Sequence, residues 1–317
     1  MQWQGKNADT IFTSLVAAVA VVFALAFEIR ESMVGRADEP LSLADLQPCC
    51  ESASPRPARL LRFAVAPLLT PGIALSGLPA FGRYLAGRIG RPVETVNCRT
   101  FAEIEAQIRL GEADVAFLGS GPFVTGREEF GLVPLAVPVV AGSATGRTYL
   151  VVPEDGPVRG WADLRGKVMA FTDSLSSSGK LVPTFALTGL GATPDGFFRR
   201  VVYTHGVMHS IKAVAHGHVD GASVDGAVFD AAVRQDPSFG RRLRVAWRSA
   251  AFGNGPVVVD GRMPGDHRAR IAAALTGMRA DPAGRQALAR LGLDGFERFE
   301  PRAYDALAAM VPRRRPR

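Results

Sequence analysis

The chain has 317 residues, of which 47% are hydrophobic and 21% charged, and its formal net charge is +7. This composition is typical of a globular protein and excludes a disordered chain, a collagen and a small disulfide scaffold. Most of the basic residues are dispersed arginines, and the one dense run, in residues 312–317, is expected to be a solvated basic tail. No zinc-finger spacing or aromatic–basic strand accompanies it, so the sequence indicates no nucleic-acid partner.

Residues 11–27 form an almost uninterrupted apolar run, followed by charged residues. Its length suits both a long signal-peptide core and a short membrane span, and Ala24-Leu25-Ala26 offers a cleavage site. We therefore predict that residues 1–27 are a signal peptide or a membrane anchor. Residues 11–27 would contact the membrane only if this segment is not cleaved. In both interpretations the rest of the chain is exported. Residues 28–59 are rich in proline and acidic residues, contain Cys49 and Cys50, and predict a flexible linker.

Strand and helix patterns alternate from residue 60 onward. Short apolar segments predict strands at 61–66, 93–96, 114–118, 149–152, 168–171, 201–203, 222–224, 243–247 and 257–260. Amphipathic or capped segments predict helices at 73–89, 101–110, 180–187, 210–215, 226–234, 266–279, 284–291 and 302–310. The apolar run 132–140 contains Pro134 and Pro138 and is too short to span a membrane.

This alternation predicts an α/β fold with two lobes, each a mixed, mainly parallel sheet flanked by helices, and a ligand cleft between the lobes. We expect lobe 1 at residues 60–147, lobe 2 at 148–254, and a return to lobe 1 with C-terminal helices at 255–311. The periodicity alone would also allow an α/β enzyme. No G-x-S-x-G elbow, H-E-x-x-H helix or phosphate-binding loop occurs, however, so we predict no catalysis and no cofactor.

Three consecutive serines, Ser176, Ser177 and Ser178, precede Gly179 and a predicted helix that holds Pro183 in its first turn. A helix start carries unpaired backbone N–H groups and the positive end of the helix dipole. Three hydroxyls beside those groups would form a neutral, donor-rich cradle for an oxyanion. Simple capping is the alternative interpretation, although a single serine is enough to cap a helix.

Several blocks, in the same order and spacing over residues 60–300, resemble the PhnD-like family of periplasmic solute-binding proteins for phosphonate, phosphite and related oxyanions. The blocks are Tyr84-Leu85-Ala86 with Gly90-Arg91-Pro92-Val93, residues 111–119, residues 162–167, residues 173–179, Phe197-Phe198, and residues 211–214 with 218–222. The resemblance implies a type 2 periplasmic-binding-protein fold. It further implies a periplasmic protein, soluble or tethered by its N-terminal anchor, that captures a small oxyanion by hinge closure and delivers it to an ABC transporter permease. The alternative is a membrane-tethered sensor subunit, for arsenite or another oxyanion, that signals to a histidine kinase.

The same resemblance implies ligand-binding positions. Ser176, Ser177, Ser178 and Gly179 would hold the ligand oxygens. Thr70, in the loop after the first strand, and Ser120, after the third strand, would face the same cleft. Phe101 stands where the family often has a tyrosine, and a core role is its alternative.

Asp225 matches an acidic position that accepts a ligand proton or an amine, with helix capping as the alternative. Val207 stands where the phosphonate pattern has a ligand-binding histidine, although His205 and His209 flank it. If Val207 faces the cleft, the loss of this donor, together with the hydroxyl that Phe101 lacks, suggests a ligand that is smaller or less charged than a phosphonate. Cys98, close to Phe101, is a candidate soft ligand for arsenite or an ordinary buried residue, and we expect no resident metal.

Overall fold

The computed structural model describes residues 60–65, 71–98 and 100–311. The predicted leader (1–27), linker (28–59) and basic tail (312–317), and the predicted site residue Thr70, lie outside the described residues. Among the helices that are described, none combines the length and the hydrophobicity that crossing a membrane requires.

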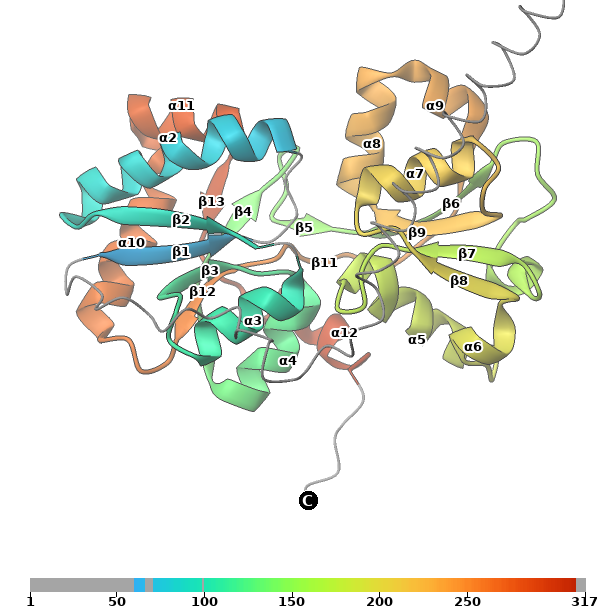
Figure 1. The fold of residues 1–317 in the computed structure, drawn as a ribbon, viewed down its shortest axis with the longest axis horizontal. Helices are drawn as coiled ribbons and strands as arrows, with labels where there is room; N and C mark the ends of the chain where they lie inside the picture. Colours follow the sequence, from blue (N-terminus) through green and yellow to red (C-terminus); the bar gives the residue numbers. More distant parts are fainter. Residues whose placement is uncertain (1–59, 66–70, 99, 312–317) are drawn as a thin grey trace, which may run out of the picture. The chain divides into compact units, whose positions relative to one another are not determined.

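The first sheet has six strands in the order β13-β4-β12-β3-β1-β2 (Figure 1). Its strands are β1 (Leu61–Val65), β2 (Val93–Asn97), β3 (Val115–Phe117), β4 (Leu132–Val139), β12 (Val257–Asp260) and β13 (Gly295–Glu297). The neighbours β2, β1 and β3 run parallel, whereas β12, β4 and β13 add antiparallel pairs. The parallel strands are the ones connected through helices, as crossover connections require.

Helices cover both faces of the first sheet. On one face, buried side chains of α2 (Pro71–Ile89), α10 (Gly265–Thr276) and α11 (Pro282–Leu291) form a single core with the strands. On the other face, α3 (Phe101–Arg109), α4 (Ser120–Phe130) and α12 (Asp305–Ala308) form a second core. The prediction of a sheet covered on both faces is therefore confirmed.

The second sheet has five strands in the order β10-β6-β9-β7-β8. Its strands are β6 (Thr148–Pro153), β7 (Val168–Phe171), β8 (Arg200–Tyr203), β9 (Gly221–Asp225) and β10 (Leu243–Arg248). The neighbours β9, β7 and β8 run parallel, and β6 pairs antiparallel with both β9 and β10. The sequence predicts mixed, mainly parallel sheets. Both sheets are mixed, but three of the five strand pairs in the first sheet and two of the four in the second are antiparallel.

Helices also cover both faces of the second sheet. Buried side chains of α7 (Val207–Ala215) and α8 (Gly226–Gln235) pack on one face, and α9 (Pro237–Arg242) contributes Phe239 to the same core. The helices α5 (Val182–Thr188) and α6 (Pro194–Phe197) pack on the other. The face that carries α5 is the one that positions the serine block.

Strand β4 differs from the sequence expectation, because its two prolines did not indicate a strand. Pro134 and Pro138 both lie within β4, which pairs on each side. The register shifts between Val257 and Val258, whose partners are Ala136 and Pro134, so that Leu135 lies at an irregularity. Such a bulge allows a proline to remain in a strand that is otherwise paired.

The chain passes between the two sheets through a short antiparallel pair, β5 (Thr145–Gly146) and β11 (Phe252–Gly253). The side chain of Asn254 donates hydrogen bonds of 3.0 Å to the carbonyls of Pro138 and Ser143. Tyr304 donates to the Asn254 carbonyl. These bonds attach the crossing strands to the residues of the first sheet and its helices.

Candidate functional site

The serine block lies where β7 leads into α5. Asp173 shapes the connecting loop, because its Oδ1 accepts a 2.8 Å hydrogen bond from the Leu175 N–H and its carbonyl accepts one of 3.2 Å from the Ser176 N–H. Ser176 then caps the helix start, with its Oγ accepting the Gly179 N–H at 3.0 Å. The capping interpretation therefore holds for one serine of the three.

The helix begins as a π-helical turn, Ser177–Leu181 (η2), before it continues as α5. The N–H of Leu181 donates to the Ser176 carbonyl at 3.0 Å, and that of Val182 donates to the Ser177 carbonyl, so the turn is one residue wider than an α-turn. Pro183, which has no N–H, follows at once. The sequence predicts the helix with Pro183 in its first turn, but it does not predict the π-turn.

All three serine side chains are buried: Ser176 is 7% exposed, and Ser177 and Ser178 are 8% exposed. The Oγ of Ser177 accepts a 2.5 Å hydrogen bond from the N–H of Gly121, in the first turn of α4. Two helix starts, one beside each sheet, therefore meet at the Ser177 hydroxyl. Ser120, predicted to face the cleft, instead donates its hydroxyl to the Gly253 carbonyl at 2.7 Å, and its neighbour Gly121 supplies the N–H.

Thr172, the residue directly after β7, contributes a buried hydroxyl to this site. Its side chain is 8% exposed, and within the described residues its Oγ1 is buried without a hydrogen-bond partner. A Cβ atom on Gly179 would lie 2.8 Å from Thr172 Oγ1 and 2.9 Å from Ser176 Oγ, so Gly179 is the residue that lets these groups come close. A buried hydroxyl without a partner is costly and needs a reason, which a ligand would provide.

Asp225 ends β9 and caps α8, in agreement with the helix-capping interpretation. Its Oδ1 accepts hydrogen bonds of 2.9 and 3.2 Å from the N–H groups of Ala227 and Val228. Burial nevertheless raises the pKa of this carboxyl group, with the two N–H donors opposing the rise. Thr148 lies directly opposite Asp225 on β6, fully buried, and its Oγ1 also has no partner among the described residues.

Phe101 is the first residue of α3 and is 5% exposed. Its ring packs under the start of α4, because a Cβ on Gly119 would be 2.9 Å from the ring edge. Cys98 is 1% exposed, and burial, with a smaller contribution from the Glu103 carboxylate, raises the pKa of its thiol to about 11. The thiol is therefore neutral at pH 7, whereas binding of a soft metal or metalloid requires a thiolate.

The residues around the start of α7 occupy different environments. His205 is exposed and has a φ of +54°, and its N–H donates to the Thr172 carbonyl at 2.9 Å. Val207 is half-buried and packs against the apolar core beneath α7. His209 is exposed, with its Nδ1 3.2 Å from the Thr204 carbonyl. Thus the backbone of His205 contacts the serine site, while the Val207 side chain joins the core.

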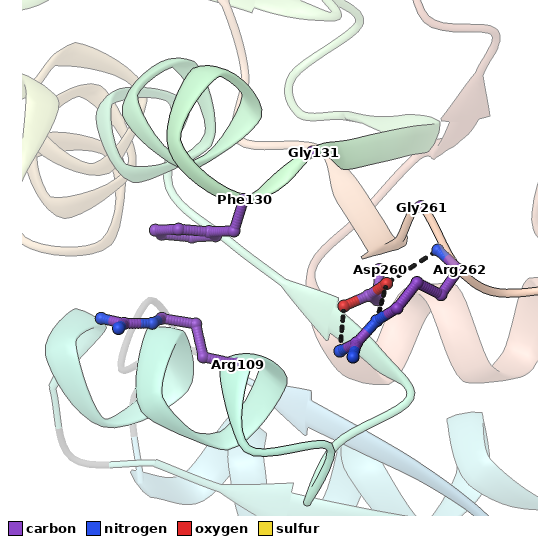
Figure 2. A pocket seen from close by; sticks show the side chains of 6 residues that line it. All are labelled: Arg109, Phe130, Gly131, Asp260, Gly261 and Arg262. Carbon is purple, nitrogen blue, oxygen red and sulfur yellow. Dashed lines mark hydrogen bonds and ion pairs between the residues drawn. The ribbon is translucent and has the colours of Figure 1, made fainter. Parts of the chain in front are cut away.

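A separate cavity of about 370 Å³ lies at the far ends of α3 and α4 (Figure 2). It is lined by Arg109, Phe130, Gly131, Asp260, Gly261 and Arg262. Arg262 is already paired with Asp260 through bonds of 2.9 and 2.7 Å, and the Arg109 guanidinium lies 5.5 Å from the centroid of the Phe130 ring. Phe130 follows Gly121 by nine residues of α4, or roughly 14 Å, so this cavity and the serine site are distinct.

Two mixed sheets flanked by helices and joined by short crossing strands define the fold of the two-lobed periplasmic binding proteins. The family model for the phosphonate ABC transporter periplasmic substrate-binding protein matches residues 63–304, and the chain belongs to this family. The family consists of substrate-binding proteins and not of enzymes.

Solved structures agree with this fold at low sequence identity. A binding protein component of an ABC phosphonate transporter from Pseudomonas aeruginosa is 18% identical, with a TM-score of 0.70 over 79% of this chain and 85% of its own. PhnD1 from Prochlorococcus marinus, in complex with methylphosphonate, is 15% identical, with a TM-score of 0.68 over 80% and 97%. XAC2383 from Xanthomonas citri, bound to ATP, is 20% identical, with a TM-score of 0.69 over 80% and 97%.

Proposed function

We propose that this protein captures a small phosphorus oxyanion, of the phosphonate, phosphite or phosphate type, at the serine block and delivers it to the permease of an ABC importer. The observation that carries the proposal is the buried start of the π-turn. Three buried serine hydroxyls lie there beside the first N–H groups of a helix and the hydroxyl of Thr172, which has no hydrogen-bond partner among the described residues. Neutral donors of this kind bind an oxyanion without a fixed counter-charge.

The charges near the serine block support a ligand of low charge. The Lys180 ammonium lies 5.5 Å from the centroid of the Tyr203 ring, so this cation is engaged beside the helix start. Asp225, with its raised pKa, can donate a proton to a ligand oxygen or accept one from a protonated oxygen or an amine. A monoanion that retains a proton, or a phosphonate that carries an amine, satisfies both features.

Lobe closure would use the crossing strands β5 and β11 as the hinge. The bond from the Gly121 N–H to Ser177 Oγ connects the two sides of the site, and an oxyanion placed there could accept both donors instead. We place the lobe boundaries as predicted from the sequence: 60–147 with 255–311, and 148–254. Export would follow from residues 1–27, with cleavage giving a soluble periplasmic protein and retention giving a tethered one.

In the alternative, a sensor subunit for arsenite, Cys98 would bind the arsenite. No contact among the described residues favours this alternative. The buried, neutral thiol disfavours that use. We therefore do not propose it as a second function.

A ligand screen tests the proposal. Thermal unfolding is measured with phosphate, phosphite, methylphosphonate, aminoethylphosphonate, arsenite, arsenate and sulfate, and positive results are titrated by calorimetry. A ligand at one hundred times its Kd stabilises the native state by about 2.7 kcal/mol. We expect this effect from at least one phosphorus oxyanion, and its loss in Ser177→Ala. Stabilisation by none of them, or by arsenite alone, would contradict the proposal.

A further inference from the structure

Ser223 lies in the middle of β9, directly beneath the π-turn. Its side chain is fully buried, and its Oγ donates a 2.5 Å hydrogen bond to the carbonyl of Ser178. The two residues are 45 positions apart in the sequence. This contact therefore joins the central part of the second sheet to the start of the helix that carries the serine block.

The Ser178 carbonyl has no donor of its own within the helix. In an α-turn it would accept the N–H of Val182, but that N–H donates to the Ser177 carbonyl. In a continued π-turn it would accept the N–H of residue 183, which is a proline and has none. The Ser223 hydroxyl supplies the hydrogen bond that both backbone patterns leave unmade.

The same peptide group is also held at its other end. The carbonyl of Ser178 and the N–H of Gly179 belong to one planar unit. The carbonyl accepts from Ser223, and the N–H donates to Ser176 Oγ at 3.0 Å. A peptide plane bonded at both ends cannot rotate without breaking one of these bonds, so the neighbouring N–H groups of the turn are fixed in direction.

We infer that Ser223 is a positioning residue: it replaces the hydrogen bond that Pro183 removes and thereby holds the π-turn in the orientation that binds the oxyanion. The inference deepens the proposed function and depends on it for its effect on affinity. Ser223 itself needs no contact with the ligand, because its hydrogen is directed to the Ser178 carbonyl.

Four proteins test the inference: wild type, Ser223→Ala, Pro183→Ala and the double variant. The probes are methylphosphonate, phosphite and inorganic phosphate, titrated by calorimetry. We expect Ser223→Ala to weaken binding about tenfold, because the released turn then has to be ordered when the ligand binds, at a cost comparable to one hydrogen bond. Pro183→Ala restores an N–H that can reach the Ser178 carbonyl, so Ser223→Ala should cost less than about twofold in that background, which is the coupling expected of groups in one network.

Thr276→Ala is the control, since it removes a hydroxyl that donates to the Ala272 carbonyl in α10 and should leave affinity unchanged. Amide hydrogen exchange provides a readout without ligand. Exchange at residues 179–182 should accelerate in Ser223→Ala and return towards the wild-type rate in the double variant, while α10 stays unchanged. Equal acceleration throughout the protein, or additive effects of the two substitutions, would overturn the inference. If the wild type binds none of the probes, the proposed function fails, and the exchange rates still decide the role of Ser223.

Discussion

Gly179→Ala is the substitution that tests the packing of the site most sharply. A Cβ at this position would lie 2.6 Å from Thr172 Cβ, 2.8 Å from Thr172 Oγ1 and 2.9 Å from Ser176 Oγ. Carbon atoms in contact are normally about 3.5–4.0 Å apart, so Thr172 or the turn has to move by roughly 1 Å. Overpacking of this kind costs about 1–3 kcal/mol.

Gly87→Ala is the matched control, because Gly87 lies inside α2 and a Cβ there would meet nothing within 4 Å. In a helix interior, alanine is favoured over glycine by about 0.8–1.0 kcal/mol, so Gly87→Ala should stabilise the protein by that amount. Gly179→Ala gains helix propensity as Gly87→Ala does, so this gain cancels when the unfolding free energies of the two variants are compared. Gly179→Ala should therefore be less stable than Gly87→Ala by about 1–3 kcal/mol.

The assay is urea unfolding of both variants and wild type, together with calorimetric titration of the best oxyanion from the screen. Gly179→Ala should also weaken ligand binding, because the displaced Ser176 hydroxyl no longer caps Gly179. Gly87→Ala should bind as wild type does. If the two alanine variants unfold with the same free energy within about 0.5 kcal/mol, or if Gly179→Ala binds normally, the close packing of Thr172, Ser176 and Gly179 is refuted.

Three further predictions concern the three serines together, Ala141 and Asp225. Replacing Ser176, Ser177 and Ser178 together by alanine should weaken oxyanion binding by at least about 2 kcal/mol, and unchanged calorimetric affinity would exclude the serine block as the site. Ala141→Asn should stabilise the protein by about 0.5–1 kcal/mol in urea unfolding, since Ala141 has a φ of +49° and precedes Gly142 at +77°, where Asn-Gly is favoured; a loss of stability would contradict this. The raised pKa of Asp225 means that the native protein keeps this proton to higher pH than the unfolded chain, so its contribution to stability falls as pH rises above about 4. Asp225→Asn should therefore become more stable relative to wild type between pH 4 and pH 7, and a constant difference across that range would show that the carboxyl is not perturbed.

The central strands and the serine block could be predicted from the sequence because their signals are local. The strand predicted at 168–171 has the observed bounds of β7, in which every residue is buried between two layers of helices. The serine block was identified from three hydroxyls before a helix start, and all three are buried there. The family resemblance is confirmed by the match over residues 63–304.

Helix α4 was not predicted, because its sequence is rich in residues that disfavour helices. Gly121, Pro122 and Gly126 all lie within it, and Gly119 and the left-handed Gly131 (φ +68°) bound it. Gly126 gives room to its neighbours, since a Cβ there would lie 2.7 Å from the ends of the Leu132 and Phe130 side chains. Tertiary packing here overrides intrinsic helix propensity.

The parts of the site that could not be predicted are those that depend on contacts between residues far apart in the sequence. Ser223 bonds Ser178 across 45 residues, and Gly121 bonds Ser177 across 56. Thr172 had one usable signal, its position at the carboxyl end of a parallel strand, where open α/β sheets bind ligands. Ser223 supplies the hydrogen bond that Pro183 cannot make, and spacing along the chain does not reveal this pairing.

A crystal structure of the protein with methylphosphonate tests the central claim most directly. The account predicts phosphonate oxygens within hydrogen-bonding distance of the Ser176–Ser178 segment, with Thr172 Oγ1 or the Gly121 N–H completing the contacts. Binding instead in the cavity between Arg109 and Arg262, or contacts that leave all three serines untouched, would contradict it.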